Sequence, residues 1–348
     1  MDIEKEYNMR AARKDEHIKL FMETVHASDN GFKDVVLQNN ALPEIDFQSI
    51  TTDCIFMDKV IGLPVMINAV TGGTEYTYDI NKQLARLSKE YNIPMAVGSQ
   101  TIAIQNKNMK DSFQIVRETN TAGLIIANVS ANSSLENMHE AVEMINADAI
   151  QLHLNTAQEI CMQEGDRNFS GILSNIKNAA KAMKVPIIVK EVGFGISYES
   201  AKKLYNVGVR YIDTGGRGGT NFIAIEDSRN MDLDYSFLRH WGISTAQSLL
   251  ECRHAAGDLK VICSGGITKA EEIVKSVAMG AALTGISGLI LRALLDNGYD
   301  GAKTVIDKLK YEMKVFMLLL GAENIEKLSK TNYFLKGDLY QLHKQKFL

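Results

Sequence analysis

Eight short apolar runs recur along the chain from residue 63 onward, and longer stretches with helical periodicity lie between them. The runs lie at 63–69, 95–98, 124–129, 149–154, 186–192, 211–213, 261–264 and 282–286. Near-continuous apolar strands separated by helices are typical of a parallel sheet that is buried on both faces. Eight such units in tandem favour a closed (β/α)8 barrel over an open sheet, which more often has about five or six strands. The sequence therefore predicts an α/β fold of the TIM-barrel type.

Two flanking segments lie outside the predicted barrel core. Residues 1–62 precede it and residues 299–348 follow it, with helical periodicity at 304–320. Neither flank is rich enough in Pro, Gly or Ser to be a disordered linker. We expect one domain over residues 1–348, with an N-terminal extension at 1–62 that closes over a substrate and a C-terminal helical extension at 299–348.

Charge and cysteine content exclude several classes of protein. With 38 Lys and Arg against 42 Asp and Glu, the net charge is -4, so bulk electrostatics would not hold nucleic acid or an anionic membrane. The 4 cysteines form no C-x-x-C pair, which argues against a zinc site or a disulfide framework. The charged N-terminus lacks a signal-peptide core, and no run reaches about 18 uninterrupted apolar residues. We expect a cytoplasmic protein.

Polar or glycine residues follow every predicted strand. In a (β/α)8 barrel, the chemistry is located at the carboxyl ends of the strands. A single Gly or Asn there more often only forms a turn, but eight such ends together predict a mouth that binds a ligand. The residues at these ends are 68–73, 98–100, 128, 153–155, 190–191, 213–216, 264–266 and 285–287.

The turns after the last two strands are the most specific. Residues 264–267 (Ser-Gly-Gly-Ile) and 285–287 (Gly-Ile-Ser) each precede a helix, where such barrels bind phosphate on backbone N–H groups. A third glycine-rich segment, 214–220, matches neither the Walker nor the Rossmann pattern. It could approach a flat ring or a phosphate closely, or it could form a flexible lid. We predict a phosphate-bearing cofactor or substrate.

Two titratable side chains stand out among the strand ends. Lys190 lies within an apolar strand, where an ammonium group is costly unless it meets an anion or an electron-rich ring. It could form a Schiff base or pair with an anionic cofactor, whereas an ion pair with Glu191 is weak because adjacent strand residues point to opposite faces. His153 could be a general acid or base, or a hydrogen-bonded turn residue.

Two further polar segments have a functional and a structural interpretation. Gln158 beside Glu159 could orient a substrate and hold Mg²⁺ through water, or could simply be an acidic helix start. Near the N-terminus, Arg13, Lys14 and His17 lie in a short charged segment that could grip a diphosphate, or could be a solvated face.

Taken together, these motifs resemble the type 2 isopentenyl diphosphate isomerases over residues 13–320. The matching segments are Arg-Lys-Asp-Glu-His at 13–17, Asn-Ala-Val-Thr-Gly-Gly at 68–73, Val-Gly-Ser at 97–99, Asn128, His-Leu-Asn-Thr-Ala-Gln-Glu at 153–159, Lys-Glu-Val-Gly-Phe-Gly at 190–195, Gly-Gly-Thr-Asn-Phe at 218–222 and Ser-Gly-Gly-Ile at 264–267. The resemblance implies a (β/α)8 barrel that binds FMN and requires Mg²⁺ and a reductant, usually NADPH. It implies interconversion of isopentenyl diphosphate and dimethylallyl diphosphate without net redox change, in a homotetramer or homo-octamer.

The resemblance also implies roles for individual residues. The residues expected at FMN are Ala69, Val70, Thr71, Ser99, Asn128, Lys190, Thr214 and Thr220, and those expected at its phosphate are Gly265, Gly266, Ile267, Gly285, Ile286 and Ser287. The substrate diphosphate would meet Arg13, Lys14 and His17, the rest of the substrate would meet His153, Asn155 and Gln158, and Mg²⁺ would meet Glu159. His153, Gln158 and Lys190 are the catalytic candidates. Because protonating an unactivated alkene suits ordinary side-chain acids poorly, we hypothesise that reduced FMN is the principal acid and base.

Two positions depart from the family pattern, and two other functions remain open. Thr101 and Gly288 stand where many members carry a basic residue, which affects the expected diphosphate grip. An FMN-dependent 2-hydroxy acid oxidase or dehydrogenase would need a catalytic histidine backed by arginines, and His240 with Arg239 is the nearest candidate. A flavin-binding or assembly module without turnover is the non-enzymatic alternative.

Overall fold

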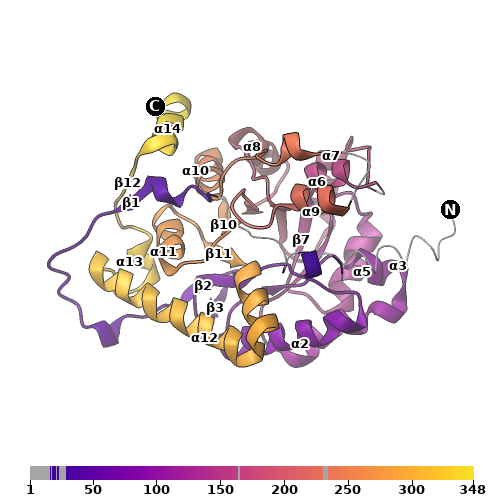
Figure 1. The fold of residues 1–348 in the computed structure, drawn as a ribbon, viewed down its shortest axis with the longest axis horizontal. Helices are drawn as coiled ribbons and strands as arrows, with labels where there is room; N and C mark the ends of the chain where they lie inside the picture. Colours follow the sequence, from indigo (N-terminus) through magenta and orange to yellow (C-terminus); the bar gives the residue numbers. More distant parts are fainter. Residues whose placement is uncertain (1–15, 17, 21, 23–28, 164, 230–233) are drawn as a thin grey trace.

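A closed barrel of eight parallel strands forms the centre of the molecule (Figure 1). The structure is a computed structural model that describes residues 16, 18–20, 22, 29–163, 165–229 and 234–348. The barrel strands are β4 (Val65–Ile67), β5 (Met95–Ala96), β6 (Ile125–Ser130), β7 (Ala149–Leu154), β8 (Ile187–Glu191), β9 (Tyr211–Asp213), β10 (Lys260–Ser264) and β11 (Leu283–Ile286). They follow one another in chain order, and β11 pairs with β4 to close the ring. The eight predicted strands and the barrel fold are thus confirmed.

Helices surround the barrel. They are α2 (Glu75–Glu90), α3 (Thr101–Gln105), α4 (Asp111–Thr119), α5 (Leu135–Met144), α6 (Thr156–Cys161), α7 (Ile172–Ala182), α8 (Tyr198–Asn206), α9 (Phe222–Arg229), α10 (Thr245–Ala255), α11 (Ala270–Ala278) and α12 (Gly288–Leu320). Serine side chains begin several of them, since Ser134, Ser197 and Ser244 each accept a bond from a first-turn amide N–H. The helix that follows β11 extends far beyond the barrel unit, and Gly298 introduces a kink into it at φ 66°.

The flanking segments contain strands as well as helices. An antiparallel pair joins β1 (Val35–Leu37) to β12 (Tyr333–Leu335), and β2 (Cys54–Phe56) forms a hairpin with β3 (Lys59–Ile61). The remaining elements are α13 (Ile325–Leu328), α14 (Gly337–Phe347) and the short 3-10 helices η1 (Phe32–Asp34), η2 (Phe47–Ser49), η3 (Lys107–Met109) and η4 (Ser236–Leu238). The expectation that residues 299–348 are only helical is therefore wrong at β12. This short strand pairs with a segment near the other end of the chain, which local periodicity does not reveal.

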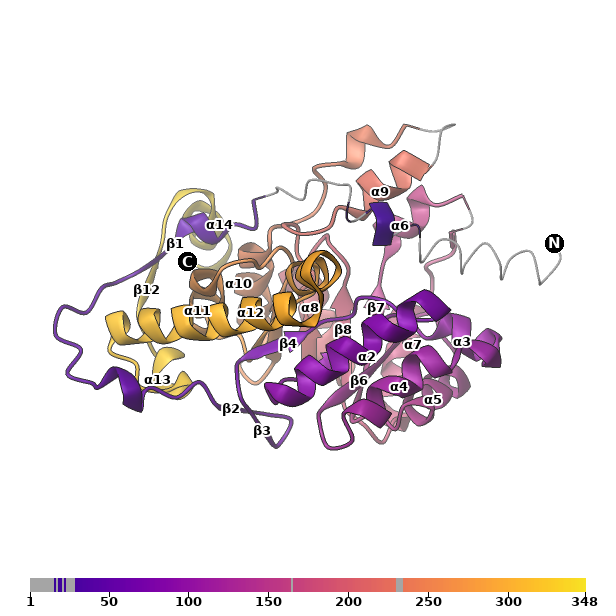
Figure 2. The same cartoon turned by 60° about the horizontal axis from the view of Figure 1, so that its bottom comes forward.

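The described parts of both flanks pack against the barrel unit. The hairpin of β2 and β3 lies below the barrel strands in Figure 2. Its Phe56 is buried against residues of the barrel interior, and its ring centroid lies 5.7 Å from that of Tyr211. At the other end of the chain, the Lys346 ammonium on α14 lies 2.8 Å from the buried Glu251 carboxylate on α10. The contact of Phe56 with Tyr211, the first residue of β9, covers the amino end of the barrel and leaves its carboxyl end for a ligand.

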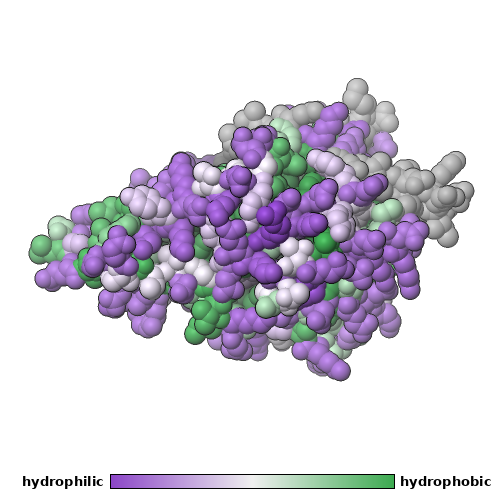
Figure 3. All heavy atoms as spheres, turned by 90° about the horizontal axis from the view of Figure 1, so that it is seen from below, coloured by the Kyte–Doolittle hydropathy of each residue, from purple (hydrophilic) through white to green (hydrophobic). Residues whose placement is uncertain are grey.

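Hydrophilic residues cover most of the face that Figure 3 shows, with small hydrophobic groups between them. Among the described residues, no helix combines the length and hydrophobicity that a membrane span requires.

Candidate active site

A cavity of about 1260 Å³ lies at the carboxyl ends of the barrel strands, and residues in or just after the last part of each of the eight strands line it. The predicted site residues in this lining are Ala69, Val70, Thr71, Ser99, Asn128, His153, Asn155, Gln158, Glu159, Lys190, Thr220, Gly265, Gly266, Ile267, Gly285, Ile286 and Ser287. Thr101 and Gly288, the two departures from the family pattern, line it as well. The structure therefore brings the dispersed strand ends together, as the strand pattern predicts.

The four other predicted residues fall into two groups. Arg13, Lys14 and His17 lie outside the described residues. Thr214 is fully buried beneath the cavity, where its hydroxyl group donates to the Ser264 carbonyl oxygen and accepts from the Ser264 N–H, both at 3.0 Å. This side chain joins β9 to β10, and its expected contact with FMN stays a prediction.

The glycine turns after β9 and β10 pack against each other. A Cβ built at Gly266 would lie 2.0 Å from the Gly218 carbonyl oxygen, and one built at Gly265 would lie 2.1 Å from the Gly216 carbonyl oxygen. Gly265 and Gly266 also have φ of 122° and 71°, a region that side chains disfavour. Because Gly216 N–H donates to the Ser264 carbonyl oxygen at 2.8 Å, the glycine-rich segment is fixed by close backbone contact, which contradicts a flexible lid at this point.

The N-terminus of α11 is capped by its own chain. The Glu272 carboxylate accepts from the Thr268 and Lys269 amides at 2.8 and 3.0 Å. Its other oxygen accepts from the Asn30 side-chain amide at 2.8 Å. A phosphate at the turn after β10 would therefore meet the backbone of residues 265–267 first, before the start of this helix.

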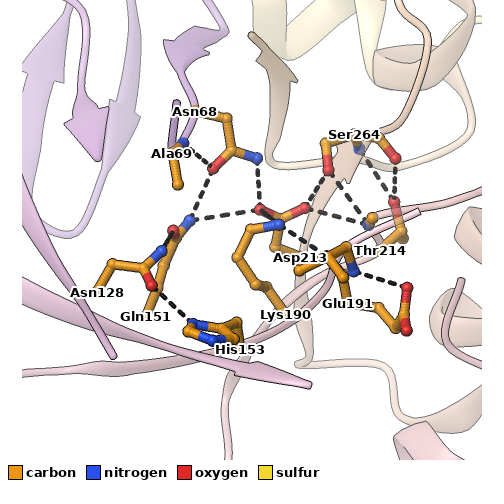
Figure 4. A network of polar contacts seen from close by, with 12 residues as sticks. Asn68, Ala69, Asn128, Gln151, His153, Lys190, Glu191, Asp213, Thr214 and Ser264 are labelled. Atoms are coloured by element: carbon orange, nitrogen blue, oxygen red, sulfur yellow. Dashed lines mark hydrogen bonds and ion pairs between the residues drawn. The ribbon is translucent and has the colours of Figure 1, made fainter. Parts of the chain in front are cut away.

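Buried polar side chains form a connected network under the cavity, which Figure 4 shows from close by. The Asp213 carboxylate is fully buried, and the Lys190 ammonium lies 3.8 Å from it. These residues face each other because β8 and β9 pair in the register that aligns Lys190 with Asp213. On the other side of β8, the register aligns Lys190 with His153 of β7. One row of the barrel thus places a histidine, a lysine and an aspartate side by side.

Lys190 is 7% exposed and lines the cavity. Its ammonium group donates to the Glu191 carbonyl oxygen at 2.7 Å, in addition to its contact with Asp213. The Lys190 ammonium group, for which the sequence indicated no partner, therefore has Asp213 as an internal counter-ion. It remains at the cavity wall, where an anionic ligand would also meet it.

Glu191 faces the other side of the strand, as its alternation with Lys190 predicts. Its carboxylate accepts from the amides of Val192, Gly193 and Phe194 at 2.6 to 2.9 Å. Burial raises the pKa of this carboxyl to about 7, although these three amides act to lower it. Glu191 therefore holds the loop after β8 in place and is not the ion-pair partner of the Lys190 ammonium.

The segment after β7 places an amide and a carboxylate at the cavity. Gln158 donates from its side-chain amide to the Glu226 carboxylate at 2.9 Å, and Glu226 is only 1% exposed. The Glu159 carboxylate accepts from the Asn155 amide at 2.6 Å and from the Asp166 backbone N–H at 2.8 Å. Within the described ranges, no group of three or more His, Cys, Asp or Glu could hold a metal ion, so Glu159 would bind one together with ligand oxygens.

Sequence reasoning missed three buried residues behind these groups: Gln151, Asp213 in its role as counter-ion, and Glu226. For Gln151 the sequence did contain a signal. Gln151 is a polar residue two positions before His153 in the same strand, so both side chains lie on the same face of β7. The partner of Gln158, by contrast, lies 68 residues away in the sequence, and no local pattern indicates it.

Comparisons with known proteins show the family of the chain. Residues 109–334 match the family model described as FMN-dependent dehydrogenase. The isopentenyl-diphosphate delta-isomerase of Bacillus licheniformis is 42% identical over 332 residues, which cover 95% of each chain. That of Moorella thermoacetica is 44% identical over 318 residues, which cover 91% of each.

Solved structures with the same fold belong to more distant proteins. A putative lactate oxidase of Pediococcus acidilactici superimposes with a TM-score of 0.69 at 15% identity, covering 96% of this chain and 94% of its own. A mandelate oxidase variant gives a TM-score of 0.65 at 17% identity, covering 96% and 99%. At these identities the likeness shows the barrel fold alone, whereas the two sequence relatives match 95% and 91% of the chain at more than 40% identity. The chain therefore belongs to the type 2 isopentenyl-diphosphate delta-isomerases, within the FMN-dependent dehydrogenase family.

Proposed function

We propose that this protein interconverts isopentenyl diphosphate and dimethylallyl diphosphate with FMN, Mg²⁺ and NADPH as a reductant. The observation that carries the proposal is identity of about 40% over almost the full chain with isomerases, combined with a cavity at the expected strand ends. We further propose that it acts in the cytoplasm as a homotetramer or homo-octamer.

The cavity has the features that FMN requires. The close-packed glycines Gly216, Gly218, Gly219, Gly265 and Gly266 offer backbone without side chains, which suits a phosphate. The turn at 285–287 lies beside residues 265–266 in the barrel. Lys190 presents a buried cation at the wall, where it would stabilise negative charge on a reduced ring. Thr71, Ser99 and Asn128 add polar groups along the same mouth.

The protein residues would position the substrate and control its charge. FMN, when bound and reduced, supplies an electron-rich ring that can exchange a proton with the alkene. Glu159 would hold Mg²⁺ against the diphosphate, with Arg13, Lys14 and His17 as further anion ligands. His153, Asn155 and Gln158 would orient the carbon chain, and the buried Glu226 holds the Gln158 amide in place. Such positioning converts remote binding energy into a lower barrier at the reacting carbons.

The purified protein tests this proposal directly. It should be yellow with bound FMN, should be bleached by NADPH, and should then isomerise isopentenyl diphosphate in the presence of Mg²⁺. Loading with 5-deazaFMN should abolish turnover and retain cofactor binding. Full activity with 5-deazaFMN would refute proton exchange at the flavin, and a yellow protein without turnover would support the flavin-binding module.

The geometry does not support the 2-hydroxy acid oxidase. Its candidate residues, Arg239 and His240, are both exposed and outside the cavity lining, and Arg239 pairs with Asp227. Reduction of the bound flavin by lactate or glycolate would nevertheless favour that reaction over the isomerase.

A further inference from the structure

The network under the cavity contains an ordered chain of side-chain amides between Asp213 and His153. Asn68 donates to Asp213 at 2.6 Å, and Gln151 donates to Asn68 at 2.9 Å. Asn128 then donates to Gln151 at 3.0 Å, and its own oxygen meets the Nδ1 atom of His153 at 2.8 Å. Asp213 and Gln151 are absent from the cavity lining, so neither touches a ligand there.

The start of this chain has a fixed direction. The Asn68 side-chain oxygen accepts from the Ala69 backbone N–H at 2.8 Å, and a backbone N–H can only donate. The Asn68 NH2 group must therefore point at Asp213. Asp213 in turn receives the Ser264 hydroxyl and the Gly215 N–H at its other oxygen, and the Lys190 ammonium lies nearby. A side chain surrounded by donors acts as an acceptor on both oxygens.

The rest of the chain must follow this direction. The Gln151 nitrogen lies 2.9 Å from the Asn68 oxygen and 3.4 Å from the Asp213 carboxylate, so two acceptors face it and it must be the NH2 group. The Gln151 oxygen consequently faces Asn128, which must donate with its own NH2. The Asn128 oxygen is then the atom that faces the His153 ring, and an amide oxygen can only accept.

We propose that Asp213 acts through this chain as a positioning residue that keeps the proton of His153 on Nδ1. Nε2 is then the ring nitrogen with a lone pair, so it is the atom of the neutral ring that can accept a hydrogen bond from a ligand. The inference deepens the proposed function, because it states which atom of His153 would serve the substrate, but it applies to the FMN-loaded protein whether or not that protein turns over. The charge that sets this tautomer lies on another strand, beneath the cavity.

Solid-state NMR of the FMN-loaded protein with ¹⁵N-labelled histidine tests the proposal, because this method works for an oligomer of any size. The measurement is made near pH 8, above the ordinary histidine pKa of about 6.5, so that the ring is neutral. His153 is identified among the 7 histidines by the signals that disappear in His153→Gln. The wild-type protein should give one Nδ1–H population. A His153 that is protonated on Nε2 in the wild-type protein would overturn the proposal.

Two substitutions then test the series of hydrogen-bonded amides between Asp213 and His153. Gln151→Met keeps the volume but interrupts the path, and Asp213→Asn removes the charge, so each should convert the single His153 population into a mixture of both tautomers. Thr284→Val is the matched control, because it deletes another fully buried hydrogen bond, to Ser276, that has no connection to His153. The control should leave the His153 signals unchanged. Folded Gln151→Met and Asp213→Asn proteins that both keep the wild-type population would refute the role of Asp213.

Discussion

The packed glycine turns allow a quantitative test of the cavity, through the substitution Gly266→Ala. The added Cβ would lie 2.0 Å from the Gly218 carbonyl oxygen and 2.1 Å from its carbon. Both atoms belong to the backbone, so they cannot rotate away as a side chain could. The residue also has φ of 71°, where a residue with a Cβ is strained. The variant therefore combines a conformational cost with a clash between two loops at the proposed phosphate site.

Two other glycines separate these costs. Gly171 has φ of 84° but nothing within 4 Å of its added Cβ, so Gly171→Ala should cost only the conformational part, roughly 1–2 kcal/mol. Gly257 has neither feature, so Gly257→Ala should be neutral or stabilising by up to about 1 kcal/mol. Overpacking adds roughly 1–3 kcal/mol, so Gly266→Ala should lose about 2–5 kcal/mol in all.

Urea unfolding of the three variants measures these free energies, and quenching of FMN fluorescence measures cofactor affinity. We expect Gly266→Ala to weaken FMN binding at least tenfold, which corresponds to about 1.4 kcal/mol, because the loops must separate where the phosphate would lie. Gly171→Ala and Gly257→Ala should bind FMN like the wild-type protein. If Gly266→Ala is no less stable than Gly171→Ala and binds FMN normally, the packed turns do not form the cofactor site.

Three further predictions concern charged groups. Burial raises the pKa of Glu191 from 4.5 to about 7, so the stability that this group contributes is complete below about pH 4.5 and is lost as the pH rises through 7. In Glu191→Gln, the free energy of unfolding measured in urea should fall by up to about 3 kcal/mol less over this pH range than in the wild-type protein. Burial acts to raise the pKa of Asp148, but its bonds with Lys59, a backbone amide and Arg117 outweigh burial and lower the pKa overall. The stability that Asp148 contributes is therefore present above its ordinary pKa of 3.8 and is lost as the pH falls below that value, so Asp148→Asn should cost about 1.5–3 kcal/mol at pH 7 and nothing at the lowest pH. Thr101→Arg restores a cation at the cavity wall and should lower the KM for isopentenyl diphosphate roughly tenfold in a steady-state assay, whereas an unchanged KM would separate this position from the diphosphate.

The fold could be predicted because the barrel pattern is local. Each strand is buried on both faces, so it appears as an apolar run, and each helix follows its strand directly along the chain. The pairing of β1 with β12 could not be predicted in this way. Residues 333–335 (Tyr-Phe-Leu) fit one turn of a helix as well as a strand, and the partner strand is nearly the whole chain away. Tertiary pairing decides the structure of such short segments.

The site could be predicted where its residues follow a strand directly. The glycine turns and Lys190 stand out because their residue types are unusual at those points of a buried strand or its end. The chain of amides could not be predicted, because its bonds join residues up to 145 positions apart and depend on the register between strands. Gln151 alone looks like one polar residue in an apolar strand, and only the closed barrel shows that it links two other side chains.

The partner of His153 bears on whether this histidine could act as a strong base. A histidine that acts as a strong base is commonly backed by a carboxylate, which stabilises the imidazolium ion after proton transfer. Here the atom that faces Nδ1 is the amide oxygen of Asn128. The carboxylate of Asp213 lies at the other end of the hydrogen-bonded series, beyond the amides of Gln151 and Asn68. An amide orients the ring but stabilises its cation much less than a carboxylate would. His153 is therefore suited to hold a substrate group in a defined geometry, and the proton transfers to carbon are better assigned to a group with more basicity at that position, as the flavin hypothesis requires.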